Sequence, residues 1–223
     1  MKKIIYICLV FILVLLLISF SGLDIKVAKL FYLNGVDPSW KYSNHEIWTL
    51  LYRYGDILPN LIGISAAIML LASIHIKRLI PWRKKLILAV LLLTIAPGLI
   101  TQTLKTSWGR PRPIEVTEFG GKYEFRTPFN PDFSLMGNKN DGNSFPSGHA
   151  AIGFYLLVLY FILDKKKSFL FVGLAYGGIM ALGRMVQGGH FLSDVLTSLF
   201  IVYITAEALY VILGISKTKY KEF

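Results

Sequence analysis

His190 follows directly after Gly188-Gly189, and Asp194 lies four residues after His190. On a helix that begins after the glycines, side chains four residues apart share one face. Asp194 can then accept a hydrogen bond from one ring nitrogen of His190 and leave the other nitrogen free as a nucleophile. The spacing suits phosphoryl transfer through a phosphohistidine, with Asp194 as the orienting group, although an isolated pair of this kind more often serves helix packing.

A second block, Pro146-Ser147-Gly148-His149, precedes an apolar run. Proline suits the first turn of a helix, so we expect a helix to start here. Backbone N–H groups at Ser147 and Gly148 would face an anion, as they do at other helix N-termini. His149 is then placed to protonate a departing oxygen as general acid. An ordinary capped helix is the alternative interpretation.

Three basic residues complete the pattern: Lys105, Arg112 and Arg184. A transferring phosphoryl group spreads negative charge over its oxygens, and Arg and Lys aimed at those oxygens stabilise the transition state. We therefore expect these three side chains, with Ser147 and Gly148, to bind phosphate, and we expect neither a metal nor a cofactor. The alternative for each cation is to snorkel toward lipid headgroups.

The composition indicates a membrane protein, because 54% of the 223 residues are hydrophobic and the mean hydropathy is +0.56. A span of the bilayer needs roughly 20 helical residues. Six apolar runs approach this length, and they predict an all-α, six-helix bundle forming one domain over residues 1–223. The runs cover residues 4–21, 57–76, 86–104, 147–163, 169–187 and 191–214.

The basic residues are unevenly placed along the chain. Thirteen of the 24 lysines and arginines lie at the amino terminus, in segments 77–85 and 164–168, and in the carboxyl-terminal tail. The positive-inside rule then predicts both termini in the cytoplasm and the three motif blocks on the opposite, periplasmic face. Because the basic residues form short clusters beside apolar runs, nucleic-acid binding is disfavoured, and nothing indicates an obligate protein partner.

Two outer segments, 22–56 and 105–146, could shape a headgroup site. The aromatic residues of the first, among them Trp40, Trp48 and Tyr52, are typical of anchors at the membrane interface, with direct substrate contact as the alternative. In the second, Arg110, Lys122 and Arg126 are candidates for contacts beyond the scissile phosphate, with headgroup snorkelling as the alternative. Glu207, an acid within the last apolar run, fits a structural role better than a proton route.

Together the three blocks resemble the type-2 phosphatidic acid phosphatase superfamily, membrane lipid phosphatases that share a core with vanadium haloperoxidases. The resemblance runs from Lys105 to Asp194. It implies that His190 is the nucleophile, His149 the general acid and Asp194 the orienting residue, and that the other motif residues hold the phosphate. One position departs: Gly183 stands where many members have Ser, which leaves a hydrogen bond at that point in doubt.

The resemblance implies a lipid phosphate substrate and a place in the bacterial inner membrane, in contact with membrane lipids. The Gly-Gly-His-Phe-Leu-Ser-Asp string is similar to lipid A phosphatases and favours removal of the 1-phosphate of lipid A. Undecaprenyl diphosphate, phosphatidylglycerophosphate and a lipid-to-lipid phosphotransfer remain alternatives. A transporter is disfavoured, because many transporters are built from an inverted repeat and the sequence shows none.

Overall fold

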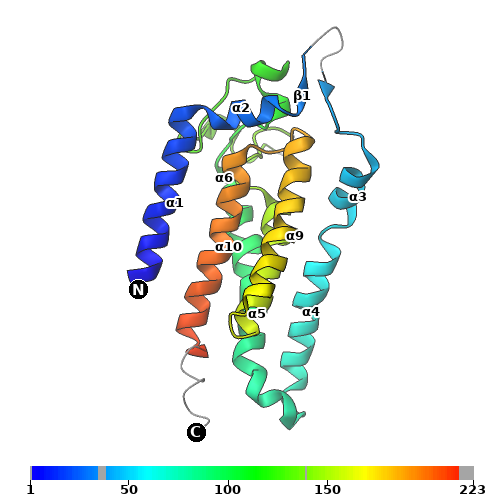
Figure 1. The fold of residues 1–223 in the computed structure, drawn as a ribbon, viewed down its shortest axis with the longest axis vertical. Coiled ribbons are helices and arrows are strands. Elements are labelled where there is room, and N and C mark those ends of the chain that lie inside the picture. The colour runs from blue at the N-terminus through cyan, green and yellow to red at the C-terminus, as the bar shows by residue number, and fades with distance from the viewer. Residues whose placement is uncertain (1, 35–38, 139, 216–223) are drawn as a thin grey trace.

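The computed structural model describes residues 2–34, 39–138 and 140–215. It is a bundle of long helices with an irregular, loop-rich layer at one end (Figure 1). Within the described residues, five helical stretches are long and apolar enough to cross a membrane. They are Lys2–Ser21, Glu46–Ala72, Lys77–Ser107, Lys167–Val186 and Leu192–Ile212. The protein is therefore a polytopic membrane protein of the predicted all-helical class.

The sixth predicted run is helical but short. Gly148–Ile162 consists of α7 (Gly148–Phe154), the 3-10 turn η6 (Tyr155–Leu157) and α8 (Val158–Ile162), and it falls below the length of the other five. It lies inside the bundle, where Tyr155, Leu157 and Val158 are fully buried. Protein rather than lipid therefore surrounds most of it, and the number of six full spans is not confirmed.

Small residues let α7 approach α9 (Lys167–Val186) closely. A Cβ atom on Gly153 would lie 2.9 Å from the Cβ of Met180, and one on Gly177 would lie 2.0 Å from the ring of Phe154. Helix pairs in membranes gain their stability from such close backbone packing rather than from a hydrophobic driving force. This contact fixes the start of α7 beside the end of α9, where two of the motif blocks lie.

The third apolar run changes its helical register before it reaches the motif. It is built of α5 (Arg83–Leu93), a π-helical segment η2 (Thr94–Thr101) and α6 (Gln102–Ser107). Pro97 lies inside the π segment, and a proline removes a donor from the α-helical ladder and crowds the preceding turn. The wider turn sets the direction in which α6 presents Lys105.

The opposite ends of the long helices carry different chemistry (Figure 1). The described basic segments lie toward the lower end of the view. Two helices begin there, α1 (Lys2–Ser21) and α9, and two end there, α4 (Ile57–Ala72) and α10 (Leu192–Ile212). The basic residues of the carboxyl-terminal tail lie outside the described residues. The upper end holds the short helix α2 (Leu23–Lys29), the two-stranded pair β1 (Tyr32–Leu33) and β2 (Ser39–Trp40), and the loop after α6.

Ion pairs fasten the lower end of α1. The carboxylate of Glu207 accepts from the ammonium groups of Lys3, at 2.9 Å, and of Lys165, at 2.9 and 3.1 Å. Higher up, the rings of Phe11 and Phe200 stack with centroids 3.9 Å apart. These contacts give Glu207 the structural role that the sequence favoured, and they hold α1 against α10.

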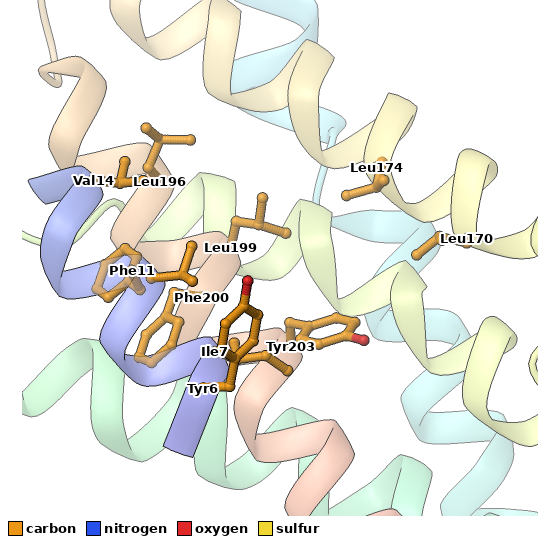
Figure 2. A pocket seen from close by; sticks show the side chains of 11 residues that line it. Tyr6, Ile7, Phe11, Val14, Leu170, Leu174, Leu196, Leu199, Phe200 and Tyr203 are labelled. Atoms are coloured by element: carbon orange, nitrogen blue, oxygen red, sulfur yellow. The ribbon is translucent and has the colours of Figure 1, made fainter. Parts of the chain in front are cut away.

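Between these contacts α1 leaves a groove of about 400 Å³ against α9 and α10 (Figure 2). Its walls are aliphatic and aromatic, and they include Val14, Leu174, Leu199 and Tyr203. Apart from two tyrosine hydroxyls the groove presents no titratable group. The groove therefore contains none of the polar residues that are candidates for catalysis.

Candidate active site

The nucleophile candidate His190 lies in the short connection between α9 and α10 and is 2% exposed. Its Nδ1 lies 2.6 Å from the carbonyl oxygen of Ser144 and 3.7 Å from Oδ2 of Asp194. The predicted hydrogen bond from His190 to Asp194 was therefore wrong, since the backbone of Ser144 takes the ring proton instead. A carbonyl only accepts, so Nδ1 carries the hydrogen and Nε2 keeps its lone pair.

Asp194 supports the orientation of His190 indirectly, through its neighbours. Its Oδ2 accepts from the Phe191 backbone N–H at 2.7 Å and from the Ser144 hydroxyl at 2.6 Å, and its Oδ1 accepts from Arg110. The carboxylate therefore caps the start of α10 and holds the segment whose carbonyl binds His190. Its charge still lies near the imidazole, where it favours the protonated ring.

Burial lowers the pKa of His190 to about 4. The carboxylate of Asp194 acts in the opposite direction, while the nearby charges of Arg184 and Lys105 lower the pKa further. Desolvation disfavours a charged imidazolium, and two cations add to that cost. His190 is consequently neutral at ordinary pH, as a nitrogen nucleophile must be.

Sequence reasoning missed the role of Arg110 in supporting the site, because it predicted only headgroup contacts for this residue. The side chain is fully buried, with Nη2 2.8 Å from Asp24 and Nη1 against Asp194 and 2.7 Å from the Ser193 hydroxyl. Asp24, on α2, also accepts from the Ser193 N–H and hydroxyl. The prediction that Arg110 contacts the headgroup or snorkels was wrong, since every direction of its fork is occupied by protein.

Lys122 and Arg126, the other headgroup candidates, lie on the outer loop and are also paired. Lys122 donates to Asp141 at 2.9 Å, and this hydrogen bond raises the pKa of Lys122 to about 12. The Arg126 guanidinium lies 3.0 Å from Asp132. Both side chains remain partly exposed, so a headgroup role would require them to exchange these partners.

The start of α7 falls where the second block predicts it. Ser147 is the N-cap residue, and its hydroxyl accepts from the Ala150 N–H at 3.4 Å. The expectation of a free N–H at Ser147 was wrong, because this group donates to the Asp194 carbonyl at 3.4 Å. Gly148 lies in the first helical turn, where N–H groups have no acceptor within the helix. A Cβ on Gly148 would lie 3.9 Å from Nζ of Lys105.

The three predicted cations converge on this point. Each is partly buried, Lys105 experiences the charges of both Arg112 and Arg184, and Arg184 experiences that of Arg112. The Nε atoms of Arg112 and Arg184 are buried, and within the described residues neither has a hydrogen-bond partner, although Nε of Arg112 forms an ion pair with Oε1 of Glu115 at 3.7 Å. Clustered cations with unsatisfied donors are an electrostatic arrangement that a bound anion would relieve.

Two glycines in the connection between α9 and α10 allow the guanidinium of Arg184 to lie beside the segment that carries His190. A Cβ on Gly189 would lie 2.4 Å from Nη2 of Arg184 and would displace it. Gly188 has φ +67°, a conformation that L side chains rarely adopt, and the ring of Trp40 packs on its open face. Trp40 is buried with Phe119 and Phe191, so its predicted place at the membrane interface was wrong.

The departure at Gly183 has a local explanation. A Cβ at this position would lie 3.1 Å from Cε3 of Trp48, on α3 (Glu46–Tyr54). The indole thus takes the space beside α9 that a serine side chain would need. The hydrogen bond that a serine could make there is replaced in this chain by an aromatic contact.

The fold and the site define a polytopic helical membrane protein with a buried neutral histidine next to three cations. The sequence pattern of the PAP2 superfamily matches residues 86–216, which contain all eight predicted site residues. The chain belongs to this superfamily. No solved structure matches it significantly.

Relatives with an assigned activity match over most of their length. The chain is 34% identical over 200 residues to a lipid A 4'-phosphatase of Francisella tularensis subsp. novicida (strain U112), with 87% of each chain covered. It is 28% identical over 197 residues to a lipid A 4'-phosphatase of Rhizobium etli, covering 79% of this chain and 74% of the relative. A lipid A 4'-phosphatase of Rhizobium leguminosarum is 29% identical over 197 residues, with coverages of 79% and 81%.

Proposed function

We propose that this protein is a phosphatase that removes the 4'-phosphate of lipid A at the periplasmic face of the bacterial inner membrane. The observation that carries the phosphatase activity is the convergence of Lys105, Arg112 and Arg184, two of them with unsatisfied buried Nε atoms, beside neutral His190. The relatives support lipid A and the 4' position, and they do not support the 1-phosphate that the sequence favoured.

In the first step Nε2 of His190 attacks phosphorus and the bond from phosphorus to the saccharide oxygen breaks. His149 gives a proton to that oxygen, so the saccharide leaves as an alcohol. In the second step water attacks phosphorus while His149 takes a proton from the water. The bond from phosphorus to Nε2 of His190 breaks and returns its electron pair to the nitrogen, and inorganic phosphate is released. The atoms balance with lipid phosphate and water as the reactants.

The cations perform the electrostatic part of this reaction. Lys105, Arg112 and Arg184 hold the phosphoryl oxygens as charge spreads over them, and the first-turn N–H of Gly148 adds a backbone donor. Ser147 shapes this turn by capping α7. Since these groups supply the positive charge that a phosphoryl transfer needs, the proposed reaction requires no metal ion.

The orientation follows from charge. The described basic residues of segments 77–85 and 164–168 lie at the end of the bundle away from the motif loops, together with the start of α1 (Figure 1). The positive-inside rule predicts that this end faces the cytoplasm, so that His190 and the loop after α6 lie at the periplasmic end of the bundle.

A substrate panel tests the proposal. Purified protein in detergent is given bis-phosphorylated lipid A, undecaprenyl diphosphate and phosphatidylglycerophosphate, with and without EDTA. We expect lipid A to lose one phosphate, tandem mass spectrometry to place the loss on the distal glucosamine, and EDTA to have no effect. Vanadate, which mimics pentacoordinate phosphorus, should inhibit.

Each departure from that result has a defined meaning. Loss of the phosphate on the reducing-end glucosamine would overturn the 4' assignment, and cleavage of undecaprenyl diphosphate or phosphatidylglycerophosphate alone would overturn lipid A. Transfer of the phosphate to another lipid, without release of free phosphate, would replace hydrolysis by phosphotransfer. Full activity of His190→Ala would end the phosphohistidine mechanism.

A further inference from the structure

Tyr52, on α3, contacts two of the proposed active-site residues at once. Its ring stacks on the imidazole of His149, with centroids 4.6 Å apart and an interplanar angle of 26°. The guanidinium carbon of Arg184 lies over the same ring, 4.5 Å from its centroid. His149 belongs to α7 and Arg184 to α9, so this one aromatic side chain from a third helix joins the two.

The contact matters because Arg184 has few other restraints. Its Nη1 donates to Oε1 of Gln187, whereas its buried Nε has no partner within the described part of the chain. An aromatic face attracts a guanidinium and defines the plane in which it lies. The ring of Tyr52 can thus hold the fork of Arg184 toward a phosphate without using the N–H groups that the phosphate needs.

The helix that carries Tyr52 is fastened to α9. The hydroxyl of Tyr176 donates to the carbonyl of Gly55 at 2.8 Å, directly after α3. Met180 packs on Gly55 so closely that a Cβ there would lie 2.3 Å from its sulfur, and Trp48 packs on Gly183. The gap between α3, His149 and Arg184 leaves no room for a water molecule. Tyr52 is therefore placed by packing on both sides of its helix turn.

We propose that Tyr52 is a positioning residue for the phosphoryl transfer, holding the general acid His149 and the phosphate-binding Arg184 in one arrangement. This inference rests on the proposed function. It assigns to Tyr52 a task different from the interfacial anchoring that its sequence neighbourhood predicts. The hydroxyl group is not part of the task, because both side-chain contacts are made by the ring. The backbone of Tyr52 also hydrogen-bonds His149, and this contact is the same in every variant at position 52.

Substitutions at Tyr52 separate this role from a structural one. Tyr52→Phe keeps the ring and should retain activity within about twofold. Tyr52→Leu and Tyr52→Met keep apolar bulk without the ring, and we expect kcat for lipid A to fall on the order of 10- to 100-fold, less than the roughly 10²- to 10⁴-fold that complete loss of a general acid costs, because His149 is misplaced rather than removed. Two ringless variants are used so that the test still stands if one of them does not fold.

The leaving group provides the discriminating readout. p-Nitrophenyl phosphate releases a phenolate that needs little protonation, so misplacement of His149 costs less with this substrate than with lipid A. The ringless variants should therefore lose less kcat with p-nitrophenyl phosphate, while KM rises for both substrates because Arg184 is also displaced. Tyr54→Leu is the matched control, since Tyr54 lies on the same helix, is similarly exposed and contacts Arg53. This control should resemble wild type.

The inference is overturned if Tyr52→Leu and Tyr52→Met match Tyr54→Leu, or if they lose activity equally with both substrates at a lowered unfolding temperature. It is also overturned if Tyr52→Phe is as impaired as the ringless variants. Absence of phosphate release from wild-type protein with every substrate would instead defeat the proposed function, so the two failures are distinguishable.

Discussion

Nδ1 of His190 lies 2.6 Å from the carbonyl oxygen of Ser144, closer than it lies to any oxygen of Asp194. The backbone carbonyl fixes the tautomer of the ring, and the carboxylate supports the carbonyl's segment through the Ser144 hydroxyl. The orienting function that the sequence assigned to one residue is thus divided between two. The division changes what substitution of Asp194 should do.

Asp194→Asn should reduce kcat on the order of 10²- to 10³-fold, less than the roughly 10⁴-fold loss seen where a carboxylate alone sets the tautomer. The Ser144 carbonyl still holds the Nδ1 proton, but the imidazolium formed during transfer loses its counter-charge. Phosphate release under saturating substrate measures the effect. Asp164→Asn, at an exposed loop position, is the control and should leave kcat unchanged.

Arg110→Met should lower the free energy of unfolding by about 3–5 kcal/mol, because it leaves the carboxylates of Asp24 and Asp194 buried without their cation. Thermal or denaturant unfolding in detergent measures the loss. Arg126→Met removes one partly exposed ion pair and should cost under about 1 kcal/mol. Equal stabilities of the two variants would contradict the structural role of Arg110.

The low pKa of His190, about 4, gives the protein a pH-dependent stability. Between about pH 6.5 and pH 4 the unfolded chain binds a proton at this histidine that the folded chain does not. Stability should therefore fall as the pH decreases through this window, by on the order of 1–3 kcal/mol from this group. The same unfolding series with His190→Gln isolates the effect, since the variant should show a shallower loss.

Cysteine accessibility tests the orientation. In a Cys8→Ser background, single cysteines at Asn140 and Lys166 both occupy exposed positions, at opposite ends of the bundle. An impermeant maleimide added to intact spheroplasts should label the first and spare the second, and lysis should make both reactive. Labelling of Lys166→Cys alone in intact cells would invert the proposed topology.

Local sequence patterns predicted the parts of the site that local rules govern. The start of α7 at Gly148 follows from Pro146 and Ser147. The start of α10 was predicted less well, because the helix begins at Leu192 and leaves His190 outside it, so His190 and Asp194 do not share a helix face as expected. The convergence of Lys105, Arg112 and Arg184 was predictable because their spacing matches one known pattern. The signal for the start of α7 lies within a few residues, whereas the cations, spread from position 105 to 184, were brought together only by their match to that pattern.

The parts that sequence did not reveal depend on long-range contacts. Asp24 meets Ser193 across 169 residues, and Tyr52 meets Arg184 from a helix whose pattern is that of an interfacial anchor. Ser144 acts through its backbone, which no side-chain pattern records. The one available signal was Asp24 itself, an acid placed among apolar residues just after the first helix, since an acid there needs a buried partner.

The contact of Asp24 with α10 has a consequence for the order in which the protein is made. Asp24 leaves the ribosome among the first residues, yet the N–H and hydroxyl groups of Ser193 that it binds belong to the last described helix. Until that helix is inserted, the carboxylate has to stay hydrated at the membrane surface. The contacts that support His190, the proposed nucleophile, are therefore completed only at the end of biogenesis.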